Sequence, residues 1–203
     1  MGRIGVLLSG CGAKDGWEIH ESVLTLLALD QAGVKVSILA PSKNQHHVID
    51  HLSNNELYQS RNILSESARI ARDNILPIEY INNSDLDALI FPGGTGMAKN
   101  IFNYAIKGSD FTIIKSVELL TQHMIINNKP LGTICIAPIM IAKVLQNMGR
   151  SGRLTGGFDK KISSDIESMG VSIGKVDARG IVVDNKIKSY QPLLTSKQNL
   201  SKR

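Results

Sequence analysis

The sequence predicts an α/β protein in which helices cover both faces of an open, mostly parallel β-sheet. Short apolar runs with strand character alternate with amphipathic stretches of helix length along the 203 residues. Glycine or asparagine follows most of the predicted helices, where a left-handed residue commonly ends a helix. No internal repeat or low-complexity linker interrupts this alternation, so we expect one domain over residues 1–203.

The first forty residues predict a β-α-β unit. Its expected elements are the strand Arg3–Ser9, the helix Trp17–Ala32 and the strand Val34–Ala40. Asp15 and Glu18 have the spacing of a capping box at the start of this helix, and Gly33 is placed to end it. Because the unit joins two strands through a helix, we expect parallel strands with a right-handed crossover.

The same alternation continues along the rest of the chain. Further predicted strands are Leu86–Phe91, Leu131–Ile134, Val171–Val176 and Ile181–Ser189, the last with a turn at Asp184-Asn185. Further predicted helices are a stretch capped by Ser60 that ends at Arg72, and then Thr112–Asn127, Ala137–Met148 and Ser163–Met169. The final stretch Gln191–Arg203 is too short and too polar for a good covering helix. We therefore expect one sheet face to be partly bare or covered by an oligomer partner.

The composition is that of a globular protein in a reducing compartment. Hydrophobic residues make up 42% of the chain and charged residues 20%. No apolar run reaches the length of a membrane span, and the N-terminus does not resemble a secretory signal. The two cysteines, Cys11 and Cys135, make neither a disulfide framework nor a zinc pattern. We expect a cytoplasmic protein with no membrane contact and no bound metal.

The net charge of +5 is weak evidence for a nucleic-acid partner. The 23 basic residues are mixed with 18 acidic ones along the body of the chain, and only the end from Lys186 onward is one-sided. A basic tail is more often a solvated terminus than a binding arm, so no nucleic-acid partner is expected.

Three loops with unusual chemistry are predicted to emerge at the same edge of the sheet. They are Ser9–Glu21, Pro92–Asn100 and Cys135–Pro138, and each follows a predicted strand. In open α/β sheets, ligands bind beyond the carboxyl ends of the strands. The convergence of these loops is the strongest functional signal in the sequence.

Cys135 stands at a predicted step from strand to helix. At such a turn the side chain projects above the sheet, and the free N–H groups of the helix start favour a thiolate. Pro138 fits the first helical turn, where a missing N–H costs nothing. A depressed pKa would make Cys135 a nucleophile. A buried, inert cysteine is an equally good interpretation of this segment alone.

Glu21 is the predicted partner of this cysteine. Glu18 and Glu21 lie three residues apart on one helix face, with His20 turned away from it. A protonated carboxyl from this helix could hydrogen-bond a thiolate and shuttle protons. The alternative is that Glu18 only caps the helix, which we prefer for that residue, and that Glu21 is an ordinary surface acid.

The run Pro92-Gly93-Gly94-Thr95-Gly96 is a third candidate. Glycines let the backbone approach a ligand closely and direct N–H groups toward it, as an oxyanion hole requires. A plain loop is the commoner explanation of such a run. It is not a phosphate-binding Walker loop, and Ser9–Gly12 does not complete a dinucleotide fingerprint.

Together these residues resemble the PfpI-like superfamily of class I glutamine-amidotransferase-like proteins. The similarity is carried by IGVLLSGCGAKDGWEIHES, SRNILSESARIAR, LDALIFPGGTGMAKN and KPLGTICIAP, which lie between about Arg3 and Pro138. Within the superfamily the sequence is most similar to the ElbB type, which is glyoxalase-like and is linked to isoprenoid biosynthesis. The family usually continues with a C-terminal helix that this chain lacks.

The resemblance implies a flavodoxin-like α/β sandwich with a nucleophile elbow, commonly dimeric and without a cofactor. It makes Cys135 the nucleophile and Glu21 its acidic partner, and it gives Gly94 and Ile136 the backbone N–H groups of an oxyanion hole. Accessory candidates are Glu18, His20, Cys11 and Asn100. Cys11 could border the same crevice and trap an oxidised Cys135 as a disulfide, although a small residue chosen to fit the turn is the better interpretation.

The order of residues excludes one activity of the wider class. Glutaminase members place a histidine after the cysteine, but all five histidines here precede Cys135. Ammonia release from glutamine by that triad is therefore not expected. The resemblance implies instead a glutathione-independent glyoxalase-like lyase that converts glyoxal or methylglyoxal to a hydroxy acid. The alternative is a non-enzymatic stress- or redox-responsive protein, and a peptidase ranks last because no histidine is evidently beside the thiol.

Overall fold

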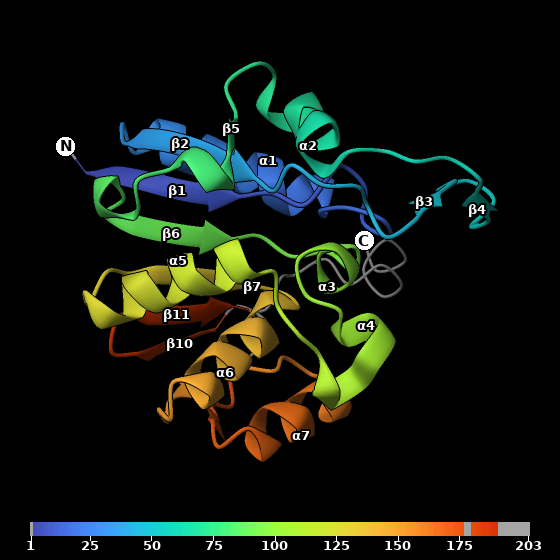
Figure 1. Ribbon diagram of the computed structural model, residues 1–203. Helices are drawn as coiled ribbons and strands as arrows, with labels where there is room; N and C mark the ends of the chain where they lie inside the picture. Colours follow the sequence, from blue (N-terminus) through green and yellow to red (C-terminus); the bar gives the residue numbers. More distant parts are fainter. Residues whose placement is uncertain (1, 177–179, 191–203) are drawn as a thin grey trace, which may run out of the picture.

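The computed structural model describes residues 2–176 and 180–190, and its centre is a seven-stranded sheet (Figure 1). The strands of this sheet are β1 (Arg3–Leu7), β2 (Lys35–Ala40), β5 (Leu76–Pro77), β6 (Ala88–Phe91), β7 (Leu131–Ile134), β10 (Ile181–Asp184) and β11 (Ile187–Tyr190). They lie side by side in the order β10-β11-β7-β6-β1-β2-β5. Neighbours are parallel except for β10 and β11, which form an antiparallel hairpin. The predicted fold class is confirmed.

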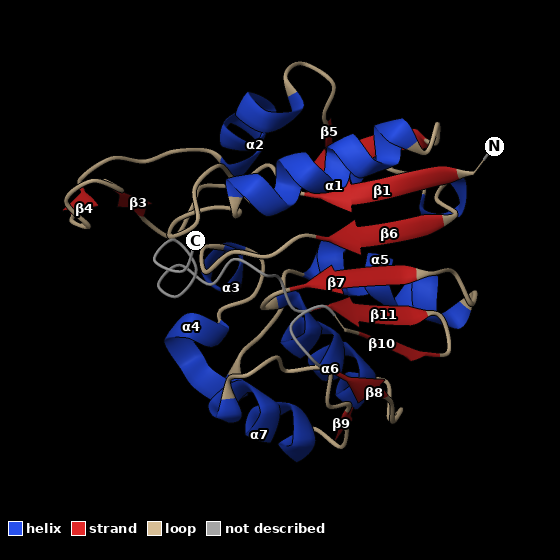
Figure 2. Cartoon of the chain, turned by 180° about the vertical axis from the view of Figure 1, so that it is seen from behind, coloured by secondary structure: helices blue, strands red, loops and turns tan. Residues whose placement is uncertain are grey.

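Helices cover both faces of the sheet. They are α1 (Ile19–Gln31), α2 (Ile63–Ala71), α3 (Met97–Asn100), α4 (Tyr104–Lys107), α5 (Lys115–Ile126), α6 (Ala137–Asn147) and α7 (Lys160–Ser168). Figure 2 shows α1 in front of one face, over β1, whereas α5 and α6 lie behind the other face. Among the described residues, no helix is both long and apolar enough to cross a membrane.

Two small ribbons lie outside the main sheet. The first pairs β3 (Val48–Ile49) with β4 (Glu56–Leu57), and the second pairs β8 (Arg153–Leu154) with β9 (Ser172–Ile173). Three single turns of 3-10 helix complete the described structure: Ile78–Tyr80, Asn83–Asp85 and Gly108–Asp110. The predicted strand Val171–Val176 is the shorter β9, which pairs with β8 outside the main sheet. The other strands of these ribbons, the turns and the short helices α3 and α4 were absent from the sequence prediction, because two to four residues are too few to show a period.

The core lies mainly between the sheet and helices α5 and α6. Leu89 and Phe91 of β6 pair in register with Leu131 and Thr133 of β7, so these four side chains share one face, and all four are buried. The apolar ones belong to the same cluster as residues of α5 and α6. On the opposite face, α1 covers the part of the sheet near β1, but Ile181 and Val183 of β10 are 53% and 47% exposed. These two side chains are exposed within the described residues, and the expectation that the face is bare or covered by a second copy stays a prediction.

The start of α1 differs from the prediction. The helix begins at Ile19, and its cap is Glu18, whose carboxylate accepts a hydrogen bond from the Glu21 N–H at 2.8 Å. Asp15 is buried in the preceding loop, where it accepts a hydrogen bond from the Ile49 N–H. The predicted capping box is wrong because Trp17 is fully buried and holds this segment as a packed loop rather than as a helical turn.

Two further boundaries are corrected by local hydrogen bonding. The cap of α2 is Asn62, not Ser60, because the Asn62 side chain accepts from two N–H groups of the first turn. The predicted strand Ile181–Ser189 is two strands around the predicted turn at Asp184-Asn185, where Asn185 has a φ of +51°. The prediction that Gln191–Arg203 forms no covering helix concerns residues outside the described ranges.

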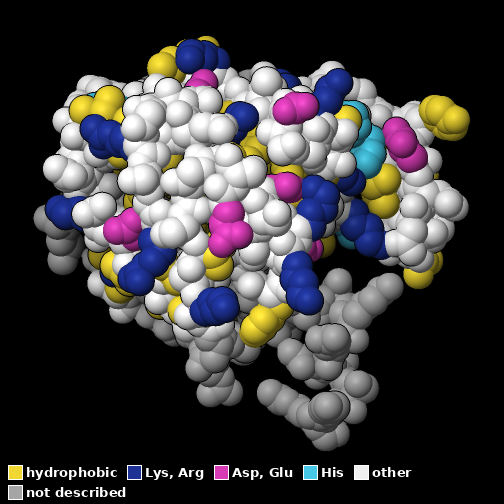
Figure 3. Space-filling model, turned by 90° about the horizontal axis from the view of Figure 1, so that it is seen from below, with side chains coloured by type: hydrophobic (Ala, Val, Ile, Leu, Met, Phe, Trp, Pro, Cys, Tyr) yellow, Lys and Arg dark blue, Asp and Glu magenta, His cyan; other side chains and the backbone are white. Residues whose placement is uncertain are grey.

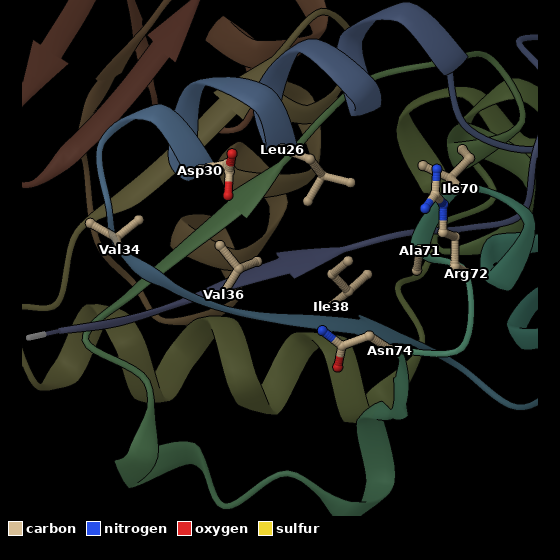
Figure 4. A pocket seen from close by; sticks show the side chains of 9 residues that line it. All are labelled: Leu26, Asp30, Val34, Val36, Ile38, Ile70, Ala71, Arg72 and Asn74. Atoms are coloured by element: carbon tan, nitrogen blue, oxygen red, sulfur yellow. The ribbon is translucent and has the colours of Figure 1, made fainter.

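A shallow groove of about 330 Å³ lies between α1, β2 and α2 (Figure 4). Leu26, Val36, Ile38 and Ile70 give it an apolar floor, and Asp30 is among its polar residues. None of the predicted site residues lines this groove, so it is separate from the site that the sequence predicted.

Leu89→Ala is expected to lower the free energy of unfolding by about 3 kcal/mol, because it removes buried methyl groups and leaves a cavity in the core. Leu119→Ala is the matched control, since Leu119 of α5 is 48% exposed and its truncation should cost less than about 0.5 kcal/mol. Urea denaturation of both variants measures the difference. Equal losses would contradict the placement of the core.

Candidate active site

Cys135 occupies a tight turn between β7 and α6. Its φ of +60° is in the left-handed region, which is uncommon and strained for a residue other than glycine. The turn is held by a hydrogen bond from the Cys135 N–H to the Tyr190 carbonyl at 3.1 Å, and Ile136 caps α6, with Pro138 in the first turn. The predicted nucleophile elbow is thus present. The Cys135 residue as a whole is exposed, whereas its sulfur lies against Glu21 with little water around it.

Glu21 lies against this cysteine from the first turn of α1. The Glu21 side chain is buried, with 8% of the residue exposed, and one carboxylate oxygen accepts a hydrogen bond from the Gly93 N–H at 2.7 Å. The carboxyl group and the Cys135 thiol are hydrogen-bond partners. A thiol and an acid that are far apart in sequence therefore meet at one point.

The backbone at Gly93 and Gly94 closes the site from the side of β6. A Cβ atom at Gly93 would overlap the Cys135 side chain and would lie 2.6 Å from a Glu21 carboxylate oxygen. Gly94 has a φ of +124°, and its N–H, like that of Ile136, forms a hydrogen bond to Cys135. Only glycine at position 93 allows the thiol and the acid to be so close.

The surroundings raise the pKa of both Glu21 and Cys135. Burial raises the pKa of Glu21 to about 7, and the hydrogen bond from Gly93 only partly offsets this shift. Loss of water around the sulfur, followed by the negative charge of Glu21, raises the pKa of Cys135 to about 12. The predicted depressed pKa of Cys135 is wrong, because the N–H groups of Gly94 and Ile136 stabilise the thiolate less than these two effects destabilise it.

The two groups titrate as a pair. With one proton between them, the charge resides on the Glu21 carboxylate, and the Cys135 sulfur keeps its proton. A carboxylate with a pKa near 7 is well suited to accept a proton from a nucleophile and to return it at neutral pH. The arrangement can therefore activate the thiol at the moment when it attacks an electrophile.

The remaining predicted residues form contacts within the loops and the helix around the site and do not lie beside the thiol. Glu18 caps α1, and its N–H donates to the Gly93 carbonyl, which ties the helix to the glycine loop. His20 is exposed and pairs with Glu18 at 2.7 Å, which raises the His20 pKa. Asn100 is buried, and its amide donates to the Ser9 and Asp15 carbonyls. The accessory roles of these residues stay predictions.

Cys11 lies in a different electrostatic environment from Cys135. It is half-buried, and burial followed by the Glu66 carboxylate raises its pKa. The Arg69 guanidinium acts on it in the opposite direction, and both residues belong to α2, whereas Glu21 is the charged group that acts on Cys135. Both thiols are free. Nothing in these surroundings supports a shared crevice, and the redox role of Cys11 stays a prediction.

Sequence reasoning missed the positioning role of Gly93 and a basic cluster around Lys99 and His47. The signal for Gly93 was the doubled glycine directly after a strand, which was assigned only to the oxyanion hole. Lys99 and His47 give no sequence signal, because they come together only when the loops after β2 and β6 pack against each other. Within residues 2–176 and 180–190, no group of three or more His, Cys, Asp or Glu side chains could hold a metal ion.

This geometry, a cysteine at a nucleophile elbow with a glutamate from the first helix in a parallel α/β sheet, defines a class I glutamine amidotransferase-like domain. No family model matches the chain. It is similar to the human protein named glutamine amidotransferase-like class 1 domain-containing protein 3, mitochondrial, with 44% identity over 147 residues. That match covers 72% of this chain, and the chain spans only 55% of the length of the human protein.

Solved structures agree with this assignment. An isoprenoid biosynthesis protein with an amidotransferase-like domain from Ehrlichia chaffeensis is 34% identical, with a TM-score of 0.84 and coverage of 93% of this chain and 87% of that one. A DJ-1 superfamily protein from Agrobacterium tumefaciens, at 16% identity and a TM-score of 0.55 over 95% of this chain and 83% of that one, shares the fold. The chain belongs to the class I glutamine amidotransferase-like family of the human and Ehrlichia chaffeensis relatives.

Glu21→Gln is expected to speed the alkylation of Cys135 by iodoacetamide at pH 8.5 by about tenfold or more, one pKa unit being a tenfold change in thiolate. The reason is that the amide removes the negative charge that raises the pKa of the thiol. Peptide-resolved mass spectrometry gives the rate, with Cys11 in the same sample as the internal control. Slower alkylation of Cys135 in this variant would mean that Glu21 stabilises the thiolate.

Proposed function

We propose that the protein is a glutathione-independent glyoxalase-like enzyme that converts small 2-oxoaldehydes, such as glyoxal and methylglyoxal, to hydroxy acids. The observation that carries the proposal is the contact between the Cys135 thiol and the Glu21 carboxyl group, whose pKa is about 7. Both groups lie at the carboxyl ends of parallel strands, where ligands bind in this class of fold. Such a pair suits an aldehyde, which is already electrophilic and needs no strong activation.

In the first step the sulfur adds to the aldehyde carbon. The Glu21 carboxylate takes the thiol proton as the carbon–sulfur bond forms, so that no free thiolate is needed. The carbonyl electrons move to oxygen, where the N–H groups of Gly94 and Ile136 are available to stabilise the oxyanion. Return of the proton to this oxygen gives a hemithioacetal on Cys135.

In the second step Glu21 moves a proton between the two substrate carbons. It removes the hydrogen from the carbon bonded to sulfur, which gives an enediol, and it delivers a proton to the neighbouring carbon. The product is a thioester of the 2-hydroxy acid on Cys135. Water then breaks the carbon–sulfur bond, which releases the acid and restores the thiol. The net change is addition of one water to the oxoaldehyde, with no external oxidant or reductant.

A glutamine-hydrolysing activity is less well supported, although the human relative is named glutamine amidotransferase-like. All five histidines precede Cys135 in the sequence, and no histidine of the described residues is among the groups that shift the pKa of this thiol. The site thus offers no imidazole to the sulfur.

A second candidate is a non-enzymatic stress- or redox-responsive protein. The raised pKa of Cys135 favours it, because a thiol with a pKa of about 12 has little thiolate at neutral pH. In either case we propose a cytoplasmic homodimer. The exposed apolar side chains of Ile19, Val23 and Leu27 along α1 support an interface between two copies.

Cys135→Ser is expected to abolish methylglyoxal consumption, and Glu21→Gln to lower kcat/KM by about 100-fold or more. The loss in the first variant follows from removal of the nucleophile, and that in the second from removal of the group that moves protons. The measurement is disappearance of methylglyoxal together with appearance of lactate.

Leu119→Ala is the control, because Leu119 is exposed on α5 and is not among the residues of the site. It should keep the turnover of the parent protein. Turnover that survives in Cys135→Ser would exclude the mechanism, and no turnover in the parent protein would favour the non-enzymatic alternative.

The pH dependence of kcat/KM should follow the ionisation of Glu21. Because the carboxylate is the proton acceptor in the first step, activity should be low at pH 5, rise through a midpoint of about 7 and level off above pH 8. A steady-state profile from pH 5 to 9 measures the midpoint. The inflection should vanish from the residual activity of Glu21→Asn or Glu21→Gln, and an unchanged midpoint in these variants would assign it to another group.

A further inference from the structure

A second arrangement of reactive groups lies at the same end of the sheet, around Lys99 of α3. The Lys99 Nζ donates to the Lys14 carbonyl at 3.0 Å and is 3.0 Å from Nε2 of His47. Lys14 follows β1, His47 follows β2 and Lys99 follows β6, so three strand ends contribute to the cluster. Figure 3 shows histidine side chains beside acidic and basic ones at one end of the molecule.

Lys99 is half-buried without a carboxylate in contact. No Asp or Glu of the described residues lies within ion-pair distance of its Nζ. The carboxylates of Asp15 and Glu56 act on Lys99 only from a greater distance, and burial outweighs them, so the pKa of Lys99 is lowered. The pKa of the neighbouring His47 is lowered too, by burial and then by the charge of Lys99.

The hydrogen bonds around Lys99 match a neutral amine. An uncharged amine has two protons and one lone pair, and the two acceptors, the Lys14 carbonyl and Nε2 of His47, take both protons. The lone pair is then free to attack. An ammonium ion would direct its third proton to solvent, because Lys99 is only half-buried. Loss of that proton leaves both contacts within the protein in place.

His47 is placed to act as a base toward this amine. Its Nε2 must be unprotonated to accept from Lys99, so its proton is on Nδ1, which faces the Glu56 carboxylate at 3.8 Å. This arrangement follows the general pattern of an activated nucleophile. Lys99 is the amine, His47 is the base, and the Glu56 carboxylate lies behind the base. The ring of His46 packs beside that of His47 with their centroids 5.0 Å apart and limits its movement.

We propose that Lys99 is a carbonyl-reactive lysine that forms an imine with small aldehydes, with His47 as the group that moves protons. The amine lone pair forms a bond to the aldehyde carbon, and the carbonyl oxygen gains the proton that leaves nitrogen through His47. His47 then takes the remaining N–H proton while the nitrogen forms a double bond to carbon and hydroxide leaves, and the resulting imidazolium gives that proton to the hydroxide. One water is released and no electrons are gained or lost. This site is independent of Cys135 and of the function proposed for it.

Reductive trapping tests the proposal. The Cys135→Ser protein is mixed with glyceraldehyde and cyanoborohydride at pH 7.5, so that the first site cannot consume the aldehyde and each imine is fixed as a stable amine. Peptide mass mapping gives the modification rate at each lysine. Lys107, an exposed lysine at the end of α4, is the reference in the same sample. We expect Lys99 to react several-fold faster than Lys107, because burial lowers the pKa of Lys99 and leaves more of it as the free amine at pH 7.5.

A His47→Gln variant in the same background tests whether fast labelling of Lys99 depends on the imidazole or only on the exposure of Lys99 to the reagent. It should slow the labelling of Lys99 several-fold and leave Lys107 unchanged, while Lys99→Arg should remove the adduct. Labelling of Lys99 no faster than that of Lys107 would overturn the proposal, whether or not the His47 variant folds. If the His47→Gln variant is folded and its Lys99 is labelled as fast as in the parent protein, the role of His47 would be overturned. Absence of glyoxalase turnover has no bearing on these rates.

Discussion

The site depends on one close approach, that of the Gly93 backbone to both Cys135 and Glu21. The Gly93 N–H donates to the Glu21 carboxylate at 2.7 Å, and its Cα faces the cysteine side chain with no room for a Cβ. The Gly93 carbonyl in turn accepts from the Glu18 N–H, so the start of α1 is fixed by the same residue. Strand β6 thus sets the distance between an acid from one part of the chain and a thiol from another.

This close approach explains the electrostatics of the pair. A carboxyl group and a thiol that share a small, poorly hydrated volume cannot both be ionised at neutral pH. The first proton leaves Glu21 at a pKa of about 7, and the second leaves Cys135 only at about 12. The site thereby stores one negative charge next to a neutral thiol, and its chemistry consists of moving a single proton between sulfur, carboxylate and substrate.

The surrounding loops show how an α/β sheet can hold two reactive groups at one edge. The loops after β1, β2 and β6 pack on one another through Asn100 and Lys99, whose side chains bond to backbone carbonyls of the first loop. Cys135 lies at the end of β7, beside the last residue of β11. Each reactive side chain therefore follows the end of a parallel strand or begins the helix after one, where helix starts and loop amides gather.

The sequence by itself determined the fold class, the elbow at Cys135 and the pairing with Glu21 as a candidate, because these follow from local patterns of apolar residues, glycine and proline. The resemblance to a known superfamily, rather than a local pattern, indicated Gly94 and Ile136 as N–H donors. Only the tertiary structure decided the start of α1, since burial of Trp17 overrides the local capping pattern. The same holds for the direction of the thiol pKa and for the contact between Lys99 and His47. Desolvation and charge depend on neighbours that lie far away along the chain, and no local pattern records them.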